Sequence, residues 1–183
     1  MDILEDFTNF ITGKRKNPEV SGKVQEAQPP QLDRYTDVVH FIESKRGKVM
    51  DAKTSTAKGH FQFIDKTWSD YVTKNKLDYT PEDRYDFEKS KKVFELFTQD
   101  NVKVLRKELA RDPTDTEKYM AHKLGPGTAA KFMKSTPNAS VDKIVSKQAL
   151  AANKNVFYTK EGKPKKVREV YSYFDDFFIN QPQ

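Results

Sequence analysis

Apolar residues recur at helical spacing along most of this chain, and the pattern is clearest near the C-terminus. The C-terminal stripe consists of Val167, Val170, Tyr171, Phe174, Phe177 and Phe178. Steps of three and four residues bring such side chains onto one face of an α-helix, where they can be buried together. Similar stripes predict helices over residues 33–44, 84–110 and 140–151, with a shorter one over 129–133. The spacing therefore favours a mostly α fold.

Capping residues mark several of the expected helix ends. Thr114 followed by Glu117 has the capping-box pattern, which predicts a helix that begins just after Thr114. Asp65 is expected to cap a helix that directs Trp68 into the core. Residues 60–63 alternate in polarity over a run so short that it predicts a loop or a brief strand. The expected architecture is a single mostly α domain with room for one small β-hairpin.

The N-terminal part of the chain is expected to lie apart from this domain. Residues 1–12 carry apolar side chains at helical spacing and predict a short amphipathic segment. Residues 12–31 hold two glycines and three prolines, which is typical of a flexible linker. The folded domain is then expected to occupy residues 32–183. The amphipathic segment would either pack on that domain or dock on another protein.

Basic residues outnumber acidic residues by 33 to 27, so the formal net charge is +6. Such an excess favours a polyanionic partner and is compatible with nucleic acid, anionic lipid or bacterial cell wall. The excess is concentrated between residues 131 and 170, where ten Lys or Arg stand against three Asp or Glu. A run of this kind forms either a solvated face or a surface that draws the protein to an anionic polymer.

The chain has no cysteine, so disulfides and thiolate chemistry are excluded. Its three histidines show no pairing at i, i+4, and we therefore expect no metal site and no cofactor. The first residues, Met1 to Phe7, are acidic and lack the apolar core of a signal peptide. No apolar run approaches the ~20 residues of a membrane span. We expect a protein without a signal peptide and without a membrane span.

Glu43 is the candidate for acid–base chemistry. It stands in the last turn of the helix expected over 33–44. The negative end of the helix dipole and the apolar neighbours both disfavour a charged carboxylate there, which predicts a raised pKa for Glu43. A carboxyl group that keeps its proton near neutral pH can act as a general acid. Further along, Gly59 precedes Gln62 and Phe63, and a glycine lets the backbone approach another segment closely.

Short motifs follow one another around and beyond this glutamate. The first three are Glu43-Ser44, Gly59-x-x-Gln62-Phe63 and Thr67-Trp68. The later ones are Pro81-Glu82-Asp83-Arg84, Thr98-x-Asp100-Asn101, Pro113-Thr114-Asp115, Tyr119-Met120-Ala121-His122-x-Leu124-Gly125-Pro126-Gly127, Ala129-Ala130-Lys131, Ala151-Ala152-Asn153, Val156-Phe157-Tyr158 and Val167-x-Glu169-Val170-Tyr171. In this order they resemble the soluble-lytic-transglycosylase-like domain, a relative of goose-type lysozyme. The resemblance covers about residues 33–178, and the order of individually weak motifs makes it specific.

The resemblance implies a lysozyme-like fold with a substrate groove, and cleavage of the β-1,4 bond between N-acetylmuramic acid and N-acetylglucosamine in peptidoglycan. In that reaction Glu43 protonates the glycosidic oxygen. As a carboxylate it then takes a proton from the muramoyl 6-hydroxyl, which attacks its own anomeric carbon and forms a 1,6-anhydro product. The implied substrate-binding residues are Ser44, Gln62, Phe63, Tyr119 and His122. Tyr119 and His122 compete for the position of a polar group beside the reacting centre.

Several proteins of this subgroup are parts of bacteriophage particles. The resemblance therefore also implies a virion protein that opens the bacterial cell wall, with residues 1–31 as a contact to other virion proteins. The sequence departs from the subgroup at His60, where an apolar residue is usual, and at Lys123, where an aromatic residue is common.

Two other functions stay open. The run Glu43-Ser44-x-x-Gly47 also resembles goose-type lysozyme, in which case Asp51 could hold a water molecule for direct hydrolysis. Alternatively, the chain is a non-catalytic, basic structural or nucleic-acid-binding virion protein. Nucleic acid is the less favoured partner, because the aromatic residues fall on buried stripes and predict no exposed stacking platform.

Overall fold

The computed structural model describes residues 33–53 and 55–179 of the 183-residue chain. The amphipathic segment and the linker expected over residues 1–31 lie outside the described residues. The helices are α2 (Arg34–Ser44), α3 (Asp65–Lys74), η1 (Pro81–Tyr85), α4 (Phe87–Leu109), α5 (Asp115–Leu124), α6 (Pro126–Lys134), η2 (Val141–Lys143), α7 (Lys147–Ala152), α8 (Lys154–Phe157) and α9 (Val167–Ile179), with η1 and η2 of the 3-10 type. In the described ranges the antiparallel pairing is limited to isolated bridges. The predicted mostly α fold is confirmed.

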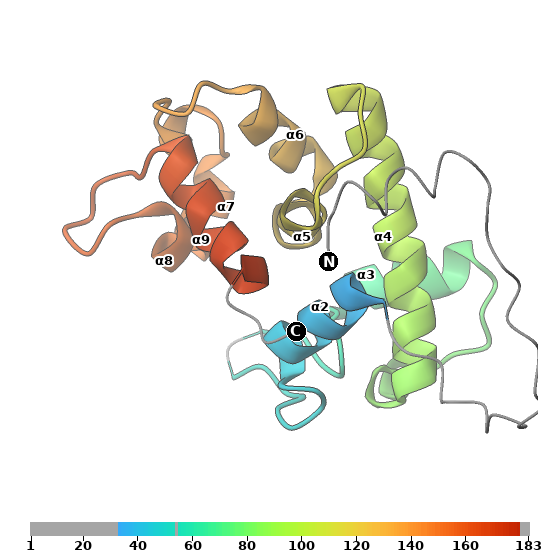
Figure 1. The fold of residues 1–183 in the computed structure, drawn as a ribbon. Coiled ribbons are helices and arrows are strands. Elements are labelled where there is room, and N and C mark those ends of the chain that lie inside the picture. Colours follow the sequence, from blue (N-terminus) through green and yellow to red (C-terminus); the bar gives the residue numbers. More distant parts are fainter. Residues whose placement is uncertain (1–32, 54, 180–183) are drawn as a thin grey trace, which may run out of the picture. The chain divides into compact units, whose positions relative to one another are not determined.

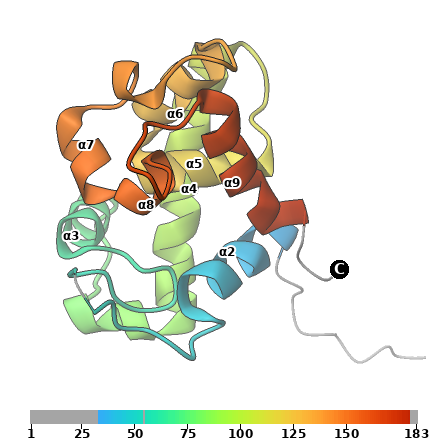
Figure 2. The same ribbon diagram turned by 90° about the vertical axis from the view of Figure 1, so that its left-hand side faces the viewer.

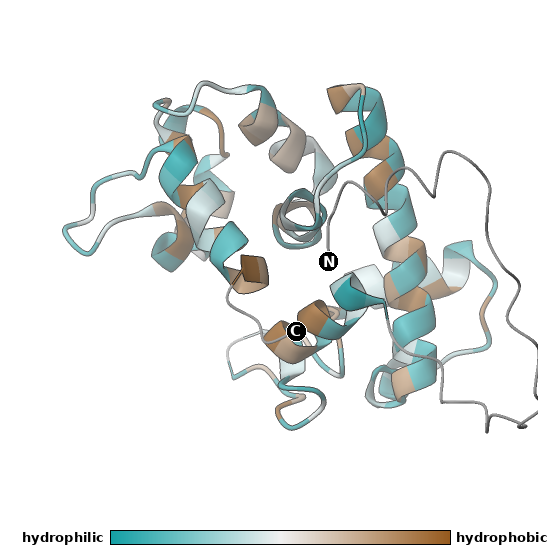
Figure 3. Ribbon diagram, viewed as in Figure 1, coloured by the Kyte–Doolittle hydropathy of each residue, from teal (hydrophilic) through white to brown (hydrophobic). Residues whose placement is uncertain are grey.

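α4 is the longest described helix and forms the central column of the domain (Figures 1 and 2). It contacts α3 and η1 on one part of its length and α5 and α6 on another. α5 in turn packs against α6 and α9, and α2 contacts α9. Hydrophobic and hydrophilic residues alternate along α4 and α9, as expected for helices with one buried stripe (Figure 3).

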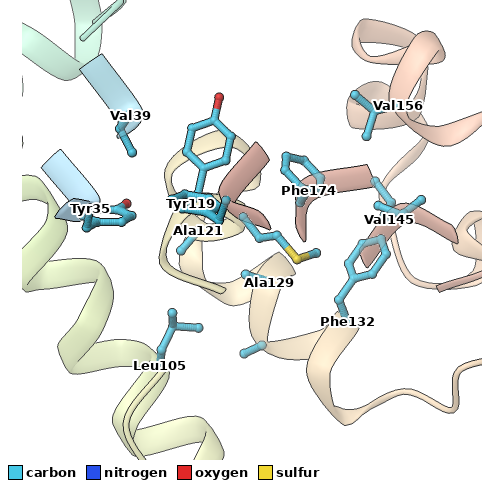
Figure 4. Close-up of a cluster of buried hydrophobic side chains, with 14 of the residues drawn as sticks. Tyr35, Val39, Leu105, Tyr119, Ala121, Ala129, Phe132, Val145, Val156 and Phe174 are labelled. Atoms are coloured by element: carbon cyan, nitrogen blue, oxygen red, sulfur yellow. The ribbon is translucent and has the colours of Figure 1, made fainter. Parts of the chain in front are cut away.

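One continuous hydrophobic core joins these helices. Leu105 of α4, Tyr119 of α5 and Phe174 of α9 meet in the cluster shown in Figure 4. The ring of Tyr119 belongs to this cluster, and its hydroxyl extends beyond it. Trp68 is also buried, as predicted, and its indole N–H donates to Thr80 O at 2.9 Å. None of the helices in the described part of the chain combines the length and apolar character of a membrane span.

Most of the expected helix ends lie close to the observed ones. The helix predicted over 33–44 is α2, and Asp33 caps it by accepting from Thr36 N at 3.0 Å. The Thr114–Glu117 capping box at α5 is present. Asp65 is the first residue of α3, and Ile64 occupies the cap position, which corrects the expected cap.

The prediction of one continuous helix over residues 140–151 is wrong. Its first part is the 3-10 turn η2, and α7 begins only after Ser146, whose hydroxyl accepts from Ala149 N at 3.2 Å. The break lies at Ser146, whose backbone is extended (φ −62°, ψ 149°) and therefore begins a new helix, while Val141 N donates to Lys165 O at 3.1 Å. Val141 and Val145 are nevertheless both buried. The predicted apolar residues therefore do face the core, although the segment is not one continuous helix.

The loop between α2 and α3 holds bridges Asp51–Lys58 and Lys58–Phe63 in place of the small hairpin. Arg84 of η1, whose side chain is 2% exposed, fastens this loop. Its guanidinium donates to Phe63 O at 3.1 Å, Pro81 O at 2.8 Å and the Asp65 carboxylate at 2.7 Å. The loop therefore depends on one buried cation more than on a β ladder.

Gly59 is required where this loop meets η1. Its φ is +76°, and a Cβ atom there would lie 1.9 Å from Arg84 O. A side chain would thus face both a disfavoured backbone conformation and a collision with main chain. The close approach expected at Gly59 is present.

Candidate active site

Glu43 is the penultimate residue of α2, and its side chain is 6% exposed. The helix ends abruptly after it, because Lys45 and Arg46 both have φ of +54° and Gly47 has φ of +80°. Ser44 secures this end: its hydroxyl donates to His40 O at 3.1 Å and accepts from Gly47 N at 3.0 Å. The carboxylate is thus placed by a fixed helix end.

Three residues of α5 surround the Glu43 carboxylate. The Tyr119 hydroxyl donates to Oε1 at 2.9 Å, and Lys123 Nζ lies 3.1 Å from Oε1 and 3.3 Å from Oε2. His122 Nε2 lies 3.5 Å from Oε1. Steps of three and four residues put these side chains on one side of α5, facing the end of α2. The structure brings together Glu43, Tyr119 and His122, three of the six predicted site residues.

The charge state of Glu43 differs from the one predicted. Burial acts most strongly on its pKa and raises it, but hydrogen bonding from His122, the charge of Lys123 and the hydroxyl of Tyr119 together lower the pKa to about 2. The prediction of a raised pKa is therefore wrong. It considered α2 alone, whereas the stabilising partners come from α5. Without a ligand, Glu43 is a carboxylate at neutral pH.

The Tyr119 hydroxyl keeps its proton and donates a hydrogen bond to Glu43. The residue is 3% exposed, and burial together with the Glu43 carboxylate raises the pKa of its hydroxyl well above the usual value. The phenol therefore stays protonated wherever the protein is folded, and Glu43 Oε1 receives its hydrogen bond at neutral pH.

His122 stands in an aromatic cage. Its ring lies 5.4 Å from the ring of Phe97, 5.8 Å from those of Phe94 and Tyr119, and 6.2 Å from that of Phe63. Its Nδ1 is buried without a hydrogen-bond partner in the described residues. The cage leaves Nε2 as the ring nitrogen that points to Glu43.

Phe63 and Ser44, both predicted to bind substrate, are buried within the protein. Phe63 is 3% exposed and packs against Trp68, Phe97 and His122, so its ring belongs to the wall behind the carboxylate. Ser44 is 1% exposed, and both of its hydrogen bonds serve the end of α2.

Gln62 acts within the loop. Its amide nitrogen donates to Met50 O and to Gly59 O, at 2.9 Å each. These bonds hold Gln62 itself in a left-handed conformation with φ of +51°. Of the two amide atoms only the oxygen could serve a ligand, so the predicted hydrogen bond between Gln62 and a sugar would have to involve that oxygen.

His60, one of the two departures from the family pattern, ties the same loop to α2. Its Nδ1 is 2.8 Å from His40 Nε2, and its Nε2 is 3.1 Å from Tyr85 O. Burial and the neighbouring His60 lower the pKa of His40 to about 4, so His40 is neutral at pH 7. The polar residue is therefore accommodated by a partner on α2, one turn before Glu43.

A hollow of about 360 Å³ opens at Glu43. Its lining residues are Ile42, Glu43, Tyr119, Lys123, Leu124, Asn153, Asn155, Val156, Tyr173, Phe174 and Phe177. Glu43 is the single carboxylate among these described residues. The wall thus combines one acid, amide side chains and aromatic rings, a combination that suits an uncharged sugar.

Among the lining residues that were not predicted to belong to a site are the polar or aromatic side chains of Asn153, Asn155, Tyr173 and Phe177. Tyr173 gave a usable signal, because it is a half-exposed aromatic residue that stands off the apolar stripe of α9. Asn153 ends one of the quoted motifs and Asn155 lies between two of them, but neither was expected beside Glu43. Lys123 was noted as a departure, but its contact with Glu43 was not foreseen.

Asp51 does not share this hollow. It is exposed, and its carboxylate accepts from the Tyr85 hydroxyl at 2.5 Å. The described residues around Glu43 therefore offer no second acid of the kind that direct hydrolysis would use. Among the described residues there is also no group of three His, Asp or Glu side chains that could hold a metal ion.

No known protein-family model matches this chain. The resemblance to the lytic-transglycosylase-like domain therefore rests on the residues and motifs of the chain itself. Another hollow, of about 910 Å³, is larger than the one at Glu43, but the residues that line it include no carboxylate. The smaller hollow is the candidate site, because there a buried carboxylate meets hydrogen-bond donors.

Proposed function

We propose that this chain is a peptidoglycan lytic transglycosylase that cleaves the β-1,4 bond between N-acetylmuramic acid and N-acetylglucosamine. The observation that carries the proposal is the buried carboxylate of Glu43, in contact with Tyr119, His122 and Lys123 and alone among the described lining residues of a partly aromatic hollow in being acidic. The ordered motifs over residues 33–178 support the same reaction.

A lone acid fits this reaction better than it fits hydrolysis. Most glycosidases need two carboxylates, one as acid and one as nucleophile or base. In a transglycosylase, Glu43 donates its proton to the glycosidic oxygen as the bond to the anomeric carbon breaks. The resulting carboxylate accepts the proton of the muramoyl 6-hydroxyl, whose oxygen bonds to the anomeric carbon. The proton returns to Glu43, and no water is consumed.

The donor step needs a protonated Glu43, and Lys123 controls that state. The side chain of Lys123 is 41% exposed at the edge of the hollow, whereas that of Glu43 is 6% exposed. A glycan that enters the hollow displaces the lysine from the carboxylate and excludes water. Both changes raise the pKa of Glu43, because burial then acts without the opposing charge. Substrate entry thus prepares the acid.

Lys123→Met is expected to raise the pKa of Glu43 in the free protein, since the removed ammonium group stabilises the carboxylate. The protonated fraction at neutral pH increases, so the basic limb of the kcat/KM profile moves to higher pH by about one unit or more. The measurement is the pH dependence of cleavage of soluble glycan strands. Lys123→Arg keeps a cation in place and should retain the wild-type profile. Superimposable profiles for Lys123→Met and wild type would refute this role of Lys123.

Digestion of purified cell-wall sacculi tests the reaction itself. Mass spectrometry of the released muropeptides should find chain ends of 1,6-anhydro-muramic acid. Ends of reducing muramic acid, heavier by one water, would instead identify the hydrolytic muramidase with Glu43 and Asp51. Intact sacculi after prolonged incubation with folded protein would favour the non-catalytic alternative. Association with a phage particle stays a prediction that follows from the resemblance.

A further inference from the structure

A second hollow, of about 910 Å³, lies beside the proposed active site. Its lining residues come from α7, α8 and the turn that follows α8. Its lining residues are Lys147, Leu150, Ala151, Lys154, Asn155, Tyr158, Thr159, Lys160, Gly162 and Lys165. We call it the lysine hollow. Asn155 lines both this hollow and the one at Glu43, so the two adjoin at that residue.

The lining of the lysine hollow is cationic, and the Glu161 carboxylate, which bonds to the Thr159 side chain, is the acidic group at its edge. Lys147, Lys154 and Lys160 are exposed, and within the described residues none of them forms an ion pair. Lys165 donates to Asn155 O at 3.1 Å and to Val156 O at 2.9 Å, which fixes the turn against the end of α8. No Asp or Glu belongs to the described lining. The basic excess seen in the sequence is thus partly gathered around one concavity.

The floor of the lysine hollow is apolar. Leu150 is 5% exposed, and Tyr158 is half-buried beside it. A ligand that matches this surface carries carboxylates or other anionic groups on a chain with small apolar side groups. A single half-buried tyrosine does not provide the row of exposed rings on which nucleic-acid bases stack.

We propose that the lysine hollow binds the peptide stem of the glycan strand whose sugars occupy the hollow at Glu43. The inference rests on the proposed function and adds a specificity to it. The N-acetylated sugars of peptidoglycan are largely uncharged, whereas the stems carry free carboxylates and alanine methyl groups. The lysines match the carboxylates, and the apolar floor matches the methyl groups. Because the two hollows adjoin at Asn155, one strand can fill both.

The test compares two forms of one ligand: soluble glycan strands that carry their peptide stems, and the same strands after an amidase has removed the stems. Binding to the full chain is measured by calorimetry at constant ionic strength. The stem variant is Lys147→Gln with Lys154→Gln and Lys160→Gln. The matched control is Lys92→Gln with Lys107→Gln and Lys131→Gln, which removes the same charge from exposed sites outside both hollows.

Wild type and the control should bind stem-bearing strands more tightly than stripped strands, and the stem variant should lose roughly tenfold in affinity for stem-bearing strands alone. Equal affinity of wild type for both strands, or an equal loss in the control, would overturn the inference. The inference would also be overturned if wild type and the control retained duplex DNA and the stem variant did not, because the ligand would then be nucleic acid. Digestion of sacculi by the same proteins tests the role of Glu43 separately. If wild type forms anhydro products but binds both kinds of strand equally, the inference fails and the proposed function is still supported.

Discussion

Glu43→Gln is expected to lower the rate of cell-wall cleavage by roughly 10³-fold, because loss of a positioned acid–base group typically costs between about 10² and 10⁴. Glutamine has the shape of glutamate and can still accept from the Tyr119 hydroxyl, so the hollow keeps its form. It can neither donate a proton to the glycosidic oxygen nor accept one from the 6-hydroxyl. The measurement is the initial rate of turbidity loss of purified sacculi, with muropeptide analysis of the products.

Asp51→Asn is the matched control for Glu43→Gln. It neutralises a carboxylate that is close to Glu43 in the sequence. That carboxylate is exposed and hydrogen-bonded to Tyr85 outside the hollow. Its activity should stay within about twofold of wild type, as befits a surface change away from the site. Undiminished clearing by Glu43→Gln would remove the catalytic proposal. A large loss in both variants would instead favour the two-carboxylate muramidase.

Arg84→Met is expected to reduce the free energy of unfolding by about 3 to 5 kcal/mol, the largest stability effect that we foresee for a single substitution. Methionine fills part of the space but removes the Arg84 donor of Pro81 O, the ion pair with Asp65, and one of the two donors of Phe63 O, which Lys58 N also serves. A buried acceptor left without a partner costs roughly 1 to 3 kcal/mol. The loop that carries Gly59 and Gln62 should loosen first. Urea unfolding followed by tryptophan fluorescence measures the change.

Arg106→Met provides the comparison for Arg84→Met. Arg106 pairs with Asp112 on the surface, where its side chain is 60% exposed. Exposed pairs of this kind contribute about 0 to 1 kcal/mol, so the unfolding midpoint should scarcely move. If both substitutions cost the same, Arg84 is an ordinary surface charge and its assigned role is wrong. Arg84→Lys should fall between the two, because one ammonium group cannot reproduce the planar fork of donors.

Local signals in the sequence were sufficient for most of the helices. The caps at Asp33 and Thr114 act on residues only three positions away, and the apolar stripe of α9 needs nothing beyond its own spacing. The failure at residues 140–151 has a different origin. The break lies at Ser146, whose extended backbone begins α7 as a new helix, while Val141 pairs with Lys165 from a distant part of the chain. Periodicity carries no information about such a contact.

The site was only partly predictable for the same reason. The position of Glu43 at the end of a helix could be inferred locally, but its charge state depends on Lys123, eighty residues later. Ser44, Gln62 and Phe63 were identified by motif, and motif does not reveal which atoms face inward. The structure shows that Ser44 and Gln62 hold main chain and that Phe63 supports His122.

The divided origin of the site limits how it can be transplanted. The acid belongs to α2 and its closest hydrogen-bond donor to α5, and the contact between Glu43 and Tyr119 spans 76 residues of chain. A designer who grafted only the Glu43-Ser44 motif onto another helical scaffold would obtain a solvated glutamate of ordinary acidity. The smallest unit that could be transferred to another protein is helices α2 and α5 together, in the orientation that they have here. Recombination that separates the two halves of this chain would likewise yield fragments with neither acid–base partner complete.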